Sequence, residues 1–185
     1  MIDIKHMRPT KLLWVDLEMT GLDPEQHVIV EVAAKITDFD FKPFGEYTAV
    51  IHQPDDVLDH ATAWNKEHHG GADGLYARSR ASTVSERDAI QALVKLIKET
   101  FGEELAVLAG NSIHQDRRFI RAWWPEVEAL LHYRMLDVSS WKVWMQGKYG
   151  LEFEKRESHL ADDDIQVSIT ELQFYLDWFR QQHAQ

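Results

Sequence analysis

Short apolar runs separated by polar turns fill the first third of the chain, which is the pattern of a β-meander. The predicted strands cover residues 11–17, 28–38 and 47–52. The turns between them, at 21–24 and 41–45, contain glycine and proline, which favour reversal of the backbone. These residues therefore predict three strands that follow one another in a single sheet.

Two capping-box patterns mark helix starts further along the chain, after a polar stretch with short helices. Thr83-x-x-Glu86 predicts a helix that ends near residue 101, with apolar positions at helical spacing. Ser112-x-x-Gln115 predicts a second helix toward residue 124. Between them, residues 105–109 form a continuous apolar run, as expected for a strand that is buried on both faces.

The remaining residues continue this alternation of strands with helices. A strand over residues 134–136 leads to Asp137, which we expect to cap a helix through residue 146. A final helix covers about 160–179. A meander followed by strands that alternate with helices predicts an α/β fold. The ribonuclease-H-like fold, a mixed five-stranded sheet flanked by helices, has this order of elements.

Length and composition predict one domain. Of the 185 residues 44% are hydrophobic, so we expect a single domain over 1–185 with its core at about 11–180. The sequence contains no cysteine, which excludes disulfides, cysteine-ligated zinc and thiol nucleophiles and fits a cytoplasmic location. No stretch has the roughly 18 apolar residues of a membrane span, and residues 1–10 lack the apolar region of a secretory signal. No membrane partner is expected.

The net charge of −11 limits the partners that this chain can bind. Proteins that hold long nucleic acids use broad basic surfaces and release counterions from the phosphates. Here no run of lysine and arginine is longer than a pair such as Arg117-Arg118. A long double-stranded nucleic acid is therefore not an expected partner, and a nucleic-acid ligand would be a short piece held in a local pocket.

Asp16 and Glu18 stand at the end of the first apolar strand and point to the same side, because side chains alternate along a strand. Two such carboxylates repel each other, and burying either one without a partner is unfavourable. A hard divalent cation such as Mg²⁺ or Mn²⁺ prefers carboxylate oxygens and would relieve the repulsion. The alternative is a strand that simply reaches solvent at this point.

Three further positions carry groups suited to the same site. Asp116 lies in the first turn of the helix after the buried strand, where α/β sheets form their functional crevice, although an aspartate there also complements the helix dipole. Asp164 is the last of three consecutive acids at the start of the final helix, and at least one of these acids would be only a dipole partner. His159 has a side chain suited to general-base work near neutral pH, unless it is an ordinary loop histidine.

The order and spacing of these residues resemble those of a known family. The DEDDh 3′→5′ exonucleases, which include polymerase proofreading domains and ribonuclease T, have motifs that resemble Asp16-x-Glu18, Asp116 and His159-x-Ala161-x-x-Asp164. Residues 16–23, 110–119 and 132–139 are similar to signatures of one group in that family, the oligoribonucleases. The resemblance extends over about residues 12–179.

The resemblance implies a two-metal hydrolase. The carboxylates of Asp16, Glu18, Asp116 and Asp164 would together hold two divalent ions, Mg²⁺ or Mn²⁺. His159 would accept the proton of the attacking water. The implied activity is that of a metal-dependent 3′→5′ exoribonuclease, which degrades short RNA oligonucleotides to 5′-mononucleotides.

Two other functions compete with this interpretation. A broader exonuclease of the ribonuclease T or proofreading type would be expected to carry basic patches for longer strands, which the net charge of −11 disfavours. A non-catalytic nucleic-acid module that has kept the fold would be expected to lack one or more of the four acids and the histidine. All five are present.

The resemblance also implies a set of substrate-binding residues: Leu22, Trp64, His69, Ser112, Gln115, Tyr133 and Arg134. Leu22 would lie between two bases and Trp64 would stack on one. Phosphate contact would fall to His69, with His68 beside it as an alternative. Ser112 and Gln115 would lie near the 5′ end of the substrate.

Tyr133 and Arg134 resemble residues that reach into the neighbouring subunit's site, so the resemblance implies a homodimer. Structural explanations stand beside these roles. Trp64 could be a core aromatic residue, Ser112 and Gln115 could serve only as helix caps, and Arg134 could be an ordinary surface arginine.

Overall fold

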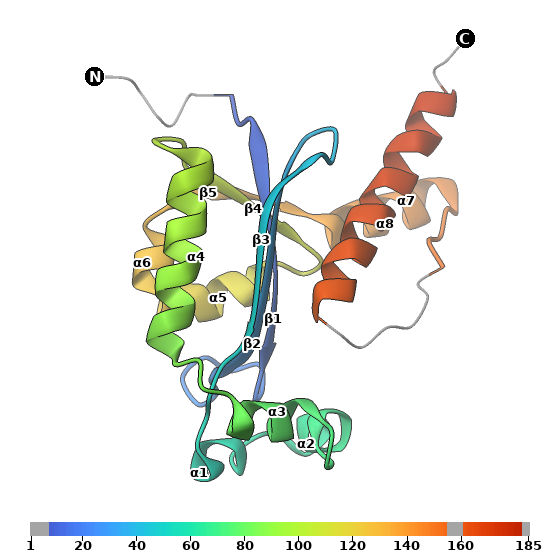
Figure 1. Ribbon diagram of the computed structural model, residues 1–185. Coiled ribbons are helices and arrows are strands. Elements are labelled where there is room, and N and C mark those ends of the chain that lie inside the picture. Colours follow the sequence, from blue (N-terminus) through green and yellow to red (C-terminus); the bar gives the residue numbers. More distant parts are fainter. Residues whose placement is uncertain (1–7, 155–160, 183–185) are drawn as a thin grey trace.

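The computed structural model describes residues 8–154 and 161–182. Its centre is a five-stranded sheet with the strand order β3-β2-β1-β4-β5 (Figure 1). The strands are β1 (Lys11–Met19), β2 (Ile29–Asp38), β3 (Pro43–Val50), β4 (Ala106–Gly110) and β5 (Leu131–Asp137). β1, β2 and β3 are antiparallel, whereas β4 is parallel to β1 and β5 is parallel to β4. The predicted α/β fold with a mixed five-stranded sheet is confirmed.

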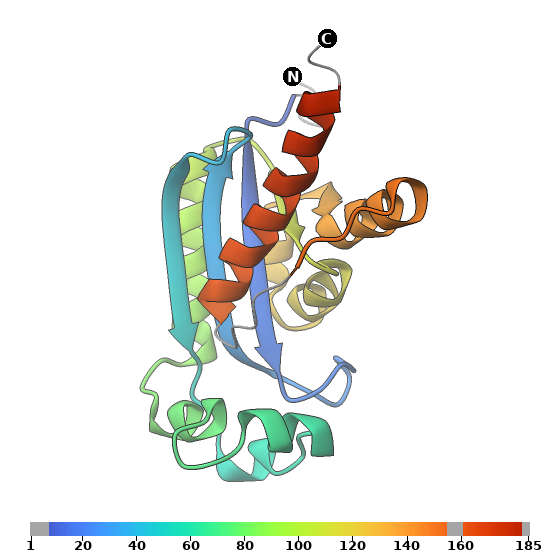
Figure 2. The ribbon, with the colours of Figure 1, turned by 90° about the vertical axis from the view of Figure 1, so that its right-hand side faces the viewer.

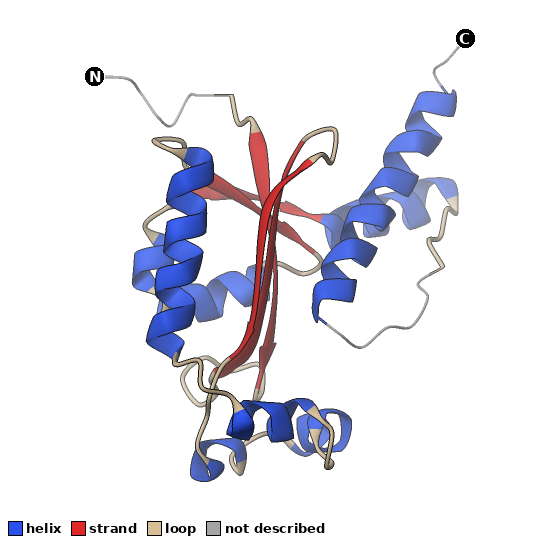
Figure 3. Ribbon diagram, viewed as in Figure 1, coloured by secondary structure: helices blue, strands red, loops and turns tan. Residues whose placement is uncertain are grey.

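Helices cover both faces of the sheet and one of its ends (Figures 1 and 3). They are α1 (Asp55–Leu58), α2 (Ala63–His69), α3 (Leu75–Ala81), α4 (Glu86–Phe101), α5 (His114–Trp123), α6 (Pro125–Glu128), α7 (Val138–Tyr149) and α8 (Ala161–Gln182). α4, α5 and α6 pack on one face, α7 and α8 on the other, and α1, α2 and α3 gather at the end where β1 finishes (Figure 2). Among the described residues, no helix is both long and apolar enough to cross a membrane.

Alternation along β1 divides the core between these two layers. Leu13, Val15 and Leu17 are buried against α4 and α5. Leu12 and Trp14 are buried on the opposite face, with residues of α7 and α8. The next positions on this second face are Asp16 and Glu18, so the strand that anchors the core also delivers two carboxylates to its rim.

Both predicted capping boxes differ from the structure. α4 is capped by Ser85, not Thr83: the Ser85 hydroxyl accepts a hydrogen bond from the backbone N–H of Asp88, whose carboxylate accepts one in return from the Ser85 N–H. Ser112 does not cap α5, because its backbone has a positive φ of 51° and the cap position is Ile113. In α4 the hydroxyl of Ser85, two residues after Thr83, takes the capping role. Before α5 the chain makes a tight turn at Ser112, which prevents the predicted cap.

Two strands also begin earlier than predicted. β3 starts at Pro43 inside the expected turn, which is possible because proline is tolerated at the first residue of an edge strand. β5 starts at Leu131, three residues before the predicted start. Its segment His132–Arg134 is polar and interrupts the apolar pattern by which a strand is recognised. The predicted cap of α7 is confirmed, since the Asp137 carboxylate accepts a hydrogen bond from the backbone N–H of Ser139 at 2.9 Å.

Candidate active site

Three predicted ligands meet where β1 ends. Asp16 and Glu18 come from β1 and Asp164 from the first turn of α8, and one carboxylate oxygen of each lies within 4.8 Å of the others. α8 crosses the sheet face beside β1 (Figure 2), where its buried Ile165 and Ile169 join the core of that face. This packing places the first turn of α8 over the two carboxylates of β1.

Asp116 reaches the same region from the other side of β1. The pairing of β1 with β4 runs from Leu12 to Trp14 and stops there, because β4 ends at Gly110 and the chain turns toward α5. The β4 side of β1 is then open to a side chain, and the Asp116 carboxylate accepts a hydrogen bond from the Leu17 N–H at 2.9 Å. The early end of β4 therefore allows the fourth predicted carboxylate to approach the other three.

The surroundings of Asp116 disfavour an isolated negative charge. Burial raises the pKa of Asp116 to about 7, against an opposing contribution from the Leu17 hydrogen bond. The negative charges of Glu18 and Asp137 also contribute to this raised pKa, to a smaller extent than burial. A cation reverses this balance, because it stabilises the ionised carboxylates that burial penalises.

The donor set fits a hard divalent ion. Asp16, Glu18 and Asp164 are half-buried and offer only oxygen atoms, which Mg²⁺, Mn²⁺ and Ca²⁺ prefer. Oxygen ligands that lie about 2.0–2.6 Å from such an ion are at most roughly 4–5 Å apart, so the observed spacing needs little adjustment. The predicted general base, His159, lies outside the described residues, as do the side chains of Asp162 and Asp163.

Helix α2 adds a histidine to this site. His69 Nε2 lies 3.4 Å from Glu18 Oε2, whereas the ring of His68 stacks on that of Trp64 with centroids 3.9 Å apart. Asn65, which is buried, donates a hydrogen bond to the Met19 carbonyl at 2.8 Å and so ties α2 to the end of β1. Of the two adjacent histidines, His69 is the one that faces the carboxylates.

The predicted base-binding residues are exposed near the same end of β1. Trp64 is 61% exposed, so the alternative of a core aromatic is wrong. Leu22 is 64% exposed in the turn that follows β1. Ser112 and Gln115 lie within one turn of Asp116, where the Ser112 N–H donates to the Asp137 carboxylate at 3.0 Å. Leu22 therefore lies just after the strand that carries Asp16 and Glu18, and Ser112 and Gln115 lie at the start of the helix that carries Asp116.

Tyr133 and Arg134 lie elsewhere on the sheet. In β5 they stand between Leu131 and Met135, and this part of the sheet aligns with Leu12, near the start of β1. At about 3.3 Å per residue, the level of Leu12 is roughly 13 Å from that of Asp16 along the strand direction. The two strand spacings from β1 to β5 add about 10 Å across the sheet. The structure thus separates these two predicted residues from the carboxylates of their own chain.

Two residues in the described part of the site were missed by the sequence interpretation. Tyr76 on α3 is buried close enough to Glu18 that the carboxylate adds to the effect of burial, which raises the pKa of Tyr76 to about 12. Asn111 donates hydrogen bonds to Ser168 at 2.9 Å and Glu171 at 3.1 Å, so it ties the end of β4 to α8. Only the position of Asn111 directly after an apolar run could have indicated its role.

These features define an acidic site on an α/β sheet that suits divalent cations, and comparison with known proteins identifies its family. A family model described as Exonuclease matches residues 13–172. The chain belongs to this exonuclease family.

Relatives along nearly the whole chain narrow the assignment to the oligoribonuclease group. The oligoribonuclease of Thiobacillus denitrificans is 43% identical over 178 residues, which cover 94% of this chain and 97% of the relative. That of Vibrio cholerae is 46% identical and covers 89% and 92% of the two chains. That of Pseudomonas syringae pv. tomato is 44% identical, with coverage of 91% and 95%.

Solved structures show the same fold at much lower identity. E. coli exonuclease I in complex with a dT13 oligonucleotide has a TM-score of 0.68 and 15% identity, and the match covers 90% of this chain. A zinc-bound complex of E. coli exonuclease I with single-stranded DNA also has a TM-score of 0.68, at 16% identity. This chain spans about 41% of those proteins, so the likeness concerns their exonuclease fold alone.

Proposed function

We propose that this protein is a 3′→5′ exoribonuclease that hydrolyses short RNA oligonucleotides to 5′-mononucleotides with divalent metal ions. The observation that carries the proposal is the convergence of Asp16, Glu18 and Asp164, which come from opposite ends of the chain. The oligoribonuclease relatives support the substrate class. The net charge of −11 supports a short substrate, because a long strand would need a broad basic surface.

The carboxylates would hold the ions, two in our proposal and either Mg²⁺ or Mn²⁺. Such ions supply Lewis acidity and lower the pKa of a bound water. Asp16, Glu18 and Asp164 would be ligands, and Asp116 would join them in its ionised form. His159 would accept the proton from the attacking water. An unchanged acidic limb in the pH–rate profile of His159→Ala would assign that proton to another group.

The exposed residues around the carboxylates would bind the substrate. Trp64 would stack on a base and Leu22 would lie between two bases, for which their exposure suits them. His69 would contact phosphate, since its ring lies beside Glu18 at the metal-binding carboxylates. Ser112 and Gln115 would lie toward the 5′ end.

The distance of Tyr133 and Arg134 from their own carboxylates supports a shared site. We infer a homodimer in which these two residues complete the site of the neighbouring subunit. They lie on β5, an edge strand, whose side chains are free to face a second copy. Large apolar side chains are also exposed nearby in the chain, at Met135 on β5 and at Val143 and Trp144 on α7.

We further infer that residues 1–185 act as one exonuclease domain in the cytoplasm. The absence of cysteine suits a reducing compartment. One cooperative thermal transition is expected for a single domain, and two separate transitions would contradict it. Recovery of the native protein in the membrane or secreted fraction of its cell would contradict the location.

Incubation with 5′-labelled RNAs of two to twenty nucleotides, with and without a chelator, tests the function. We expect stepwise loss of 3′ nucleotides, the fastest turnover on the shortest RNAs and no activity in excess chelator. Faster, processive degradation of the twenty-mer would instead favour the broader exonuclease. Full activity in chelator would refute the metal site.

A further inference from the structure

The edge strand β5 is irregular at the segment His132–Arg134. Ala106 of β4 pairs with Leu131 and Leu108 pairs with Met135, so one residue of β4 stands opposite three of β5. Such a bulge changes the direction of side chains and interrupts the regular ladder of backbone hydrogen bonds. The backbone groups of this segment therefore need partners from outside the ladder.

Arg117 on α5 provides these partners. Its Nη1 donates hydrogen bonds to the carbonyls of His132 at 2.9 Å and Tyr133 at 3.1 Å. The Arg134 N–H donates to His132 Nδ1 at 3.1 Å. One arginine thus binds two successive carbonyls of the bulge, while a side chain within the segment satisfies an amide.

The guanidinium is itself held in place. Arg117 is only 8% exposed, and its Nη2 lies 3.1 Å from Glu128 Oε1, with Nε at 3.3–3.4 Å from both carboxylate oxygens. Arg121 contacts the same carboxylate at 3.1 Å from the solvent side. A planar guanidinium spreads its donors over three nitrogens and can bind a carboxylate along one edge and carbonyls from another nitrogen, a geometry that the compact ammonium of lysine does not match.

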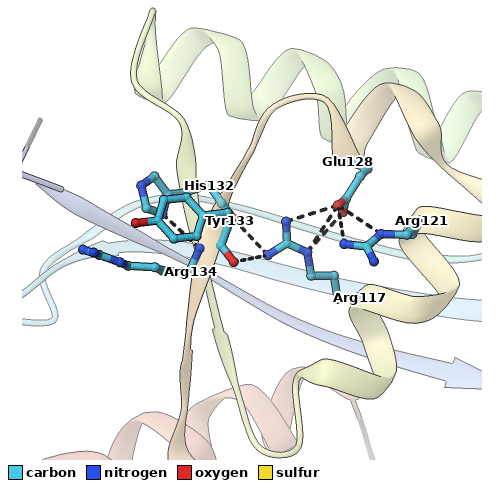
Figure 4. A network of polar contacts seen from close by, with 6 residues as sticks. All are labelled: Arg117, Arg121, Glu128, His132, Tyr133 and Arg134. Carbon is cyan, nitrogen blue, oxygen red and sulfur yellow. Dashed lines mark hydrogen bonds and ion pairs between the residues drawn. The ribbon is translucent and has the colours of Figure 1, made fainter. Parts of the chain in front are cut away.

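Figure 4 shows Arg117 on one side of β5 and the side chains of His132, Tyr133 and Arg134 on the other. The rings of His132 and Tyr133 have centroids 4.5 Å apart, and the Arg134 guanidinium lies 5.1 Å from the centre of the Tyr133 ring. The three side chains therefore form one stack whose direction follows from the backbone that Arg117 holds.

We propose that Arg117 is a positioning residue for the neighbouring subunit's active site. It fixes the bulge so that Tyr133 and Arg134 are presented to a second copy of the chain. The inference rests on the proposed shared site. Since Asp116 precedes Arg117 in α5, successive residues of one helix would serve two sites: Asp116 the site of its own chain, and Arg117 the site of the partner.

Mixed dimers separate this role from an effect within the same chain. One chain would carry Asp16→Asn, which removes a carboxylate, and the other Arg117→Gln; two different affinity tags allow purification of mixed dimers only. The Arg117→Gln homodimer should lose about tenfold to a hundredfold in turnover, the range expected for misplaced contacts. The mixed dimer should recover to about half of the wild-type value, because the intact carboxylates of the Arg117→Gln chain receive a correctly held segment from the other chain.

Three comparisons make the result decisive. Arg121→Gln, which removes the other arginine on Glu128 without touching the bulge, should stay near wild-type activity. The activity of Arg117→Lys should fall below that of wild type, because lysine keeps the positive charge but lacks the several nitrogen donors of the guanidinium. If Arg117→Gln fails to fold, as judged by thermal unfolding and dimer mass, Arg117→Lys takes its place in the mixed dimer.

Each alternative outcome overturns the proposal in a recognisable way. A mixed dimer no more active than half of the Arg117→Gln homodimer places the effect in the variant's own site. Normal activity of the homodimer removes any role for Arg117. The mixed dimer of Asp16→Asn with Arg134→Ala tests the premise of a shared site. If this dimer does not recover activity, the shared site itself is wrong. If it recovers activity but the mixed dimer with Arg117→Gln does not, only the role of Arg117 is refuted.

Discussion

The end of β1 and the bulge of β5 both gather charged side chains, but they do so in opposite ways. At the end of β1, carboxylates of one sign converge, an arrangement that a cation would stabilise. At the bulge, a buried arginine has a carboxylate and two carbonyls as partners, and the outer side chains point away from their own chain. The first region suits a cation and, in our proposal, the second faces another protein chain, so the two regions should respond differently to mutation.

The largest effect is expected at the carboxylates. Asp164→Asn keeps the shape of the side chain and removes one ligand charge, so turnover should fall by at least about 10³-fold, roughly 4 kcal/mol. Asp177→Asn is a matched control on the same helix, because Asp177 is exposed and pairs only with Arg180 among the described contacts. Steady-state kinetics at saturating Mg²⁺ or Mn²⁺ measure both. Equal losses of turnover in the two variants would show that Asp164, at the start of α8, is not a metal ligand.

Metal-free stability should depend on pH through Asp116. Its pKa of about 7 in the folded protein lies above the ordinary value of 3.8, so between these pH values the folded state binds more protons than the unfolded state. Stability therefore falls as pH rises from about 4 to 7, by up to roughly 4 kcal/mol. Chemical denaturation in chelator should show that Asp116→Asn removes this slope. An identical slope in the variant would show that Asp116 titrates normally.

Arg134 distinguishes the second region from the first. Arg134→Ala should reduce turnover by about tenfold to a hundredfold while leaving metal-free stability unchanged, since the side chain is exposed. Random co-expression with Asp16→Asn makes about half of the dimers mixed, each with one working site, so about a quarter of wild-type activity should return. Recovery no greater than the average of the two variants would place Arg134 in its own site or outside catalysis.

The smallest effect is expected at Trp64. Trp64→Ala should weaken RNA binding by about 1–3 kcal/mol, the range for the loss of base stacking, with little change in stability. Phe44→Ala removes another exposed aromatic, on edge strand β3, and should leave affinity unchanged. Titration of a labelled dinucleotide in Ca²⁺ measures both. Equal affinities of the Trp64 variant and wild type would assign base binding to another residue.

Much of the fold follows from local pattern. The alternation of Leu12 to Glu18 determined which side chains face each layer, and the continuous apolar run of β4 determined a strand buried on both faces. Local patterns were less reliable where tertiary contacts compete with them. Ser112 has a capping-box sequence, yet its N–H binds Asp137 across the turn, because the end of β4 and the start of α7 meet there.

The sequence by itself determined the chemical type of the site: carboxylates at family spacing, an acidic surface and no cysteine. Only the tertiary structure decided which groups meet. The packing of α8 brings Asp164 to Asp16, and the early end of β4 opens β1 to Asp116. The ladder register separates Arg134 from its own carboxylates, and the bulge assigns Arg117 to the backbone of β5. Spacing along a chain specifies ligand type and local direction, whereas meetings between distant elements depend on how their apolar faces pack.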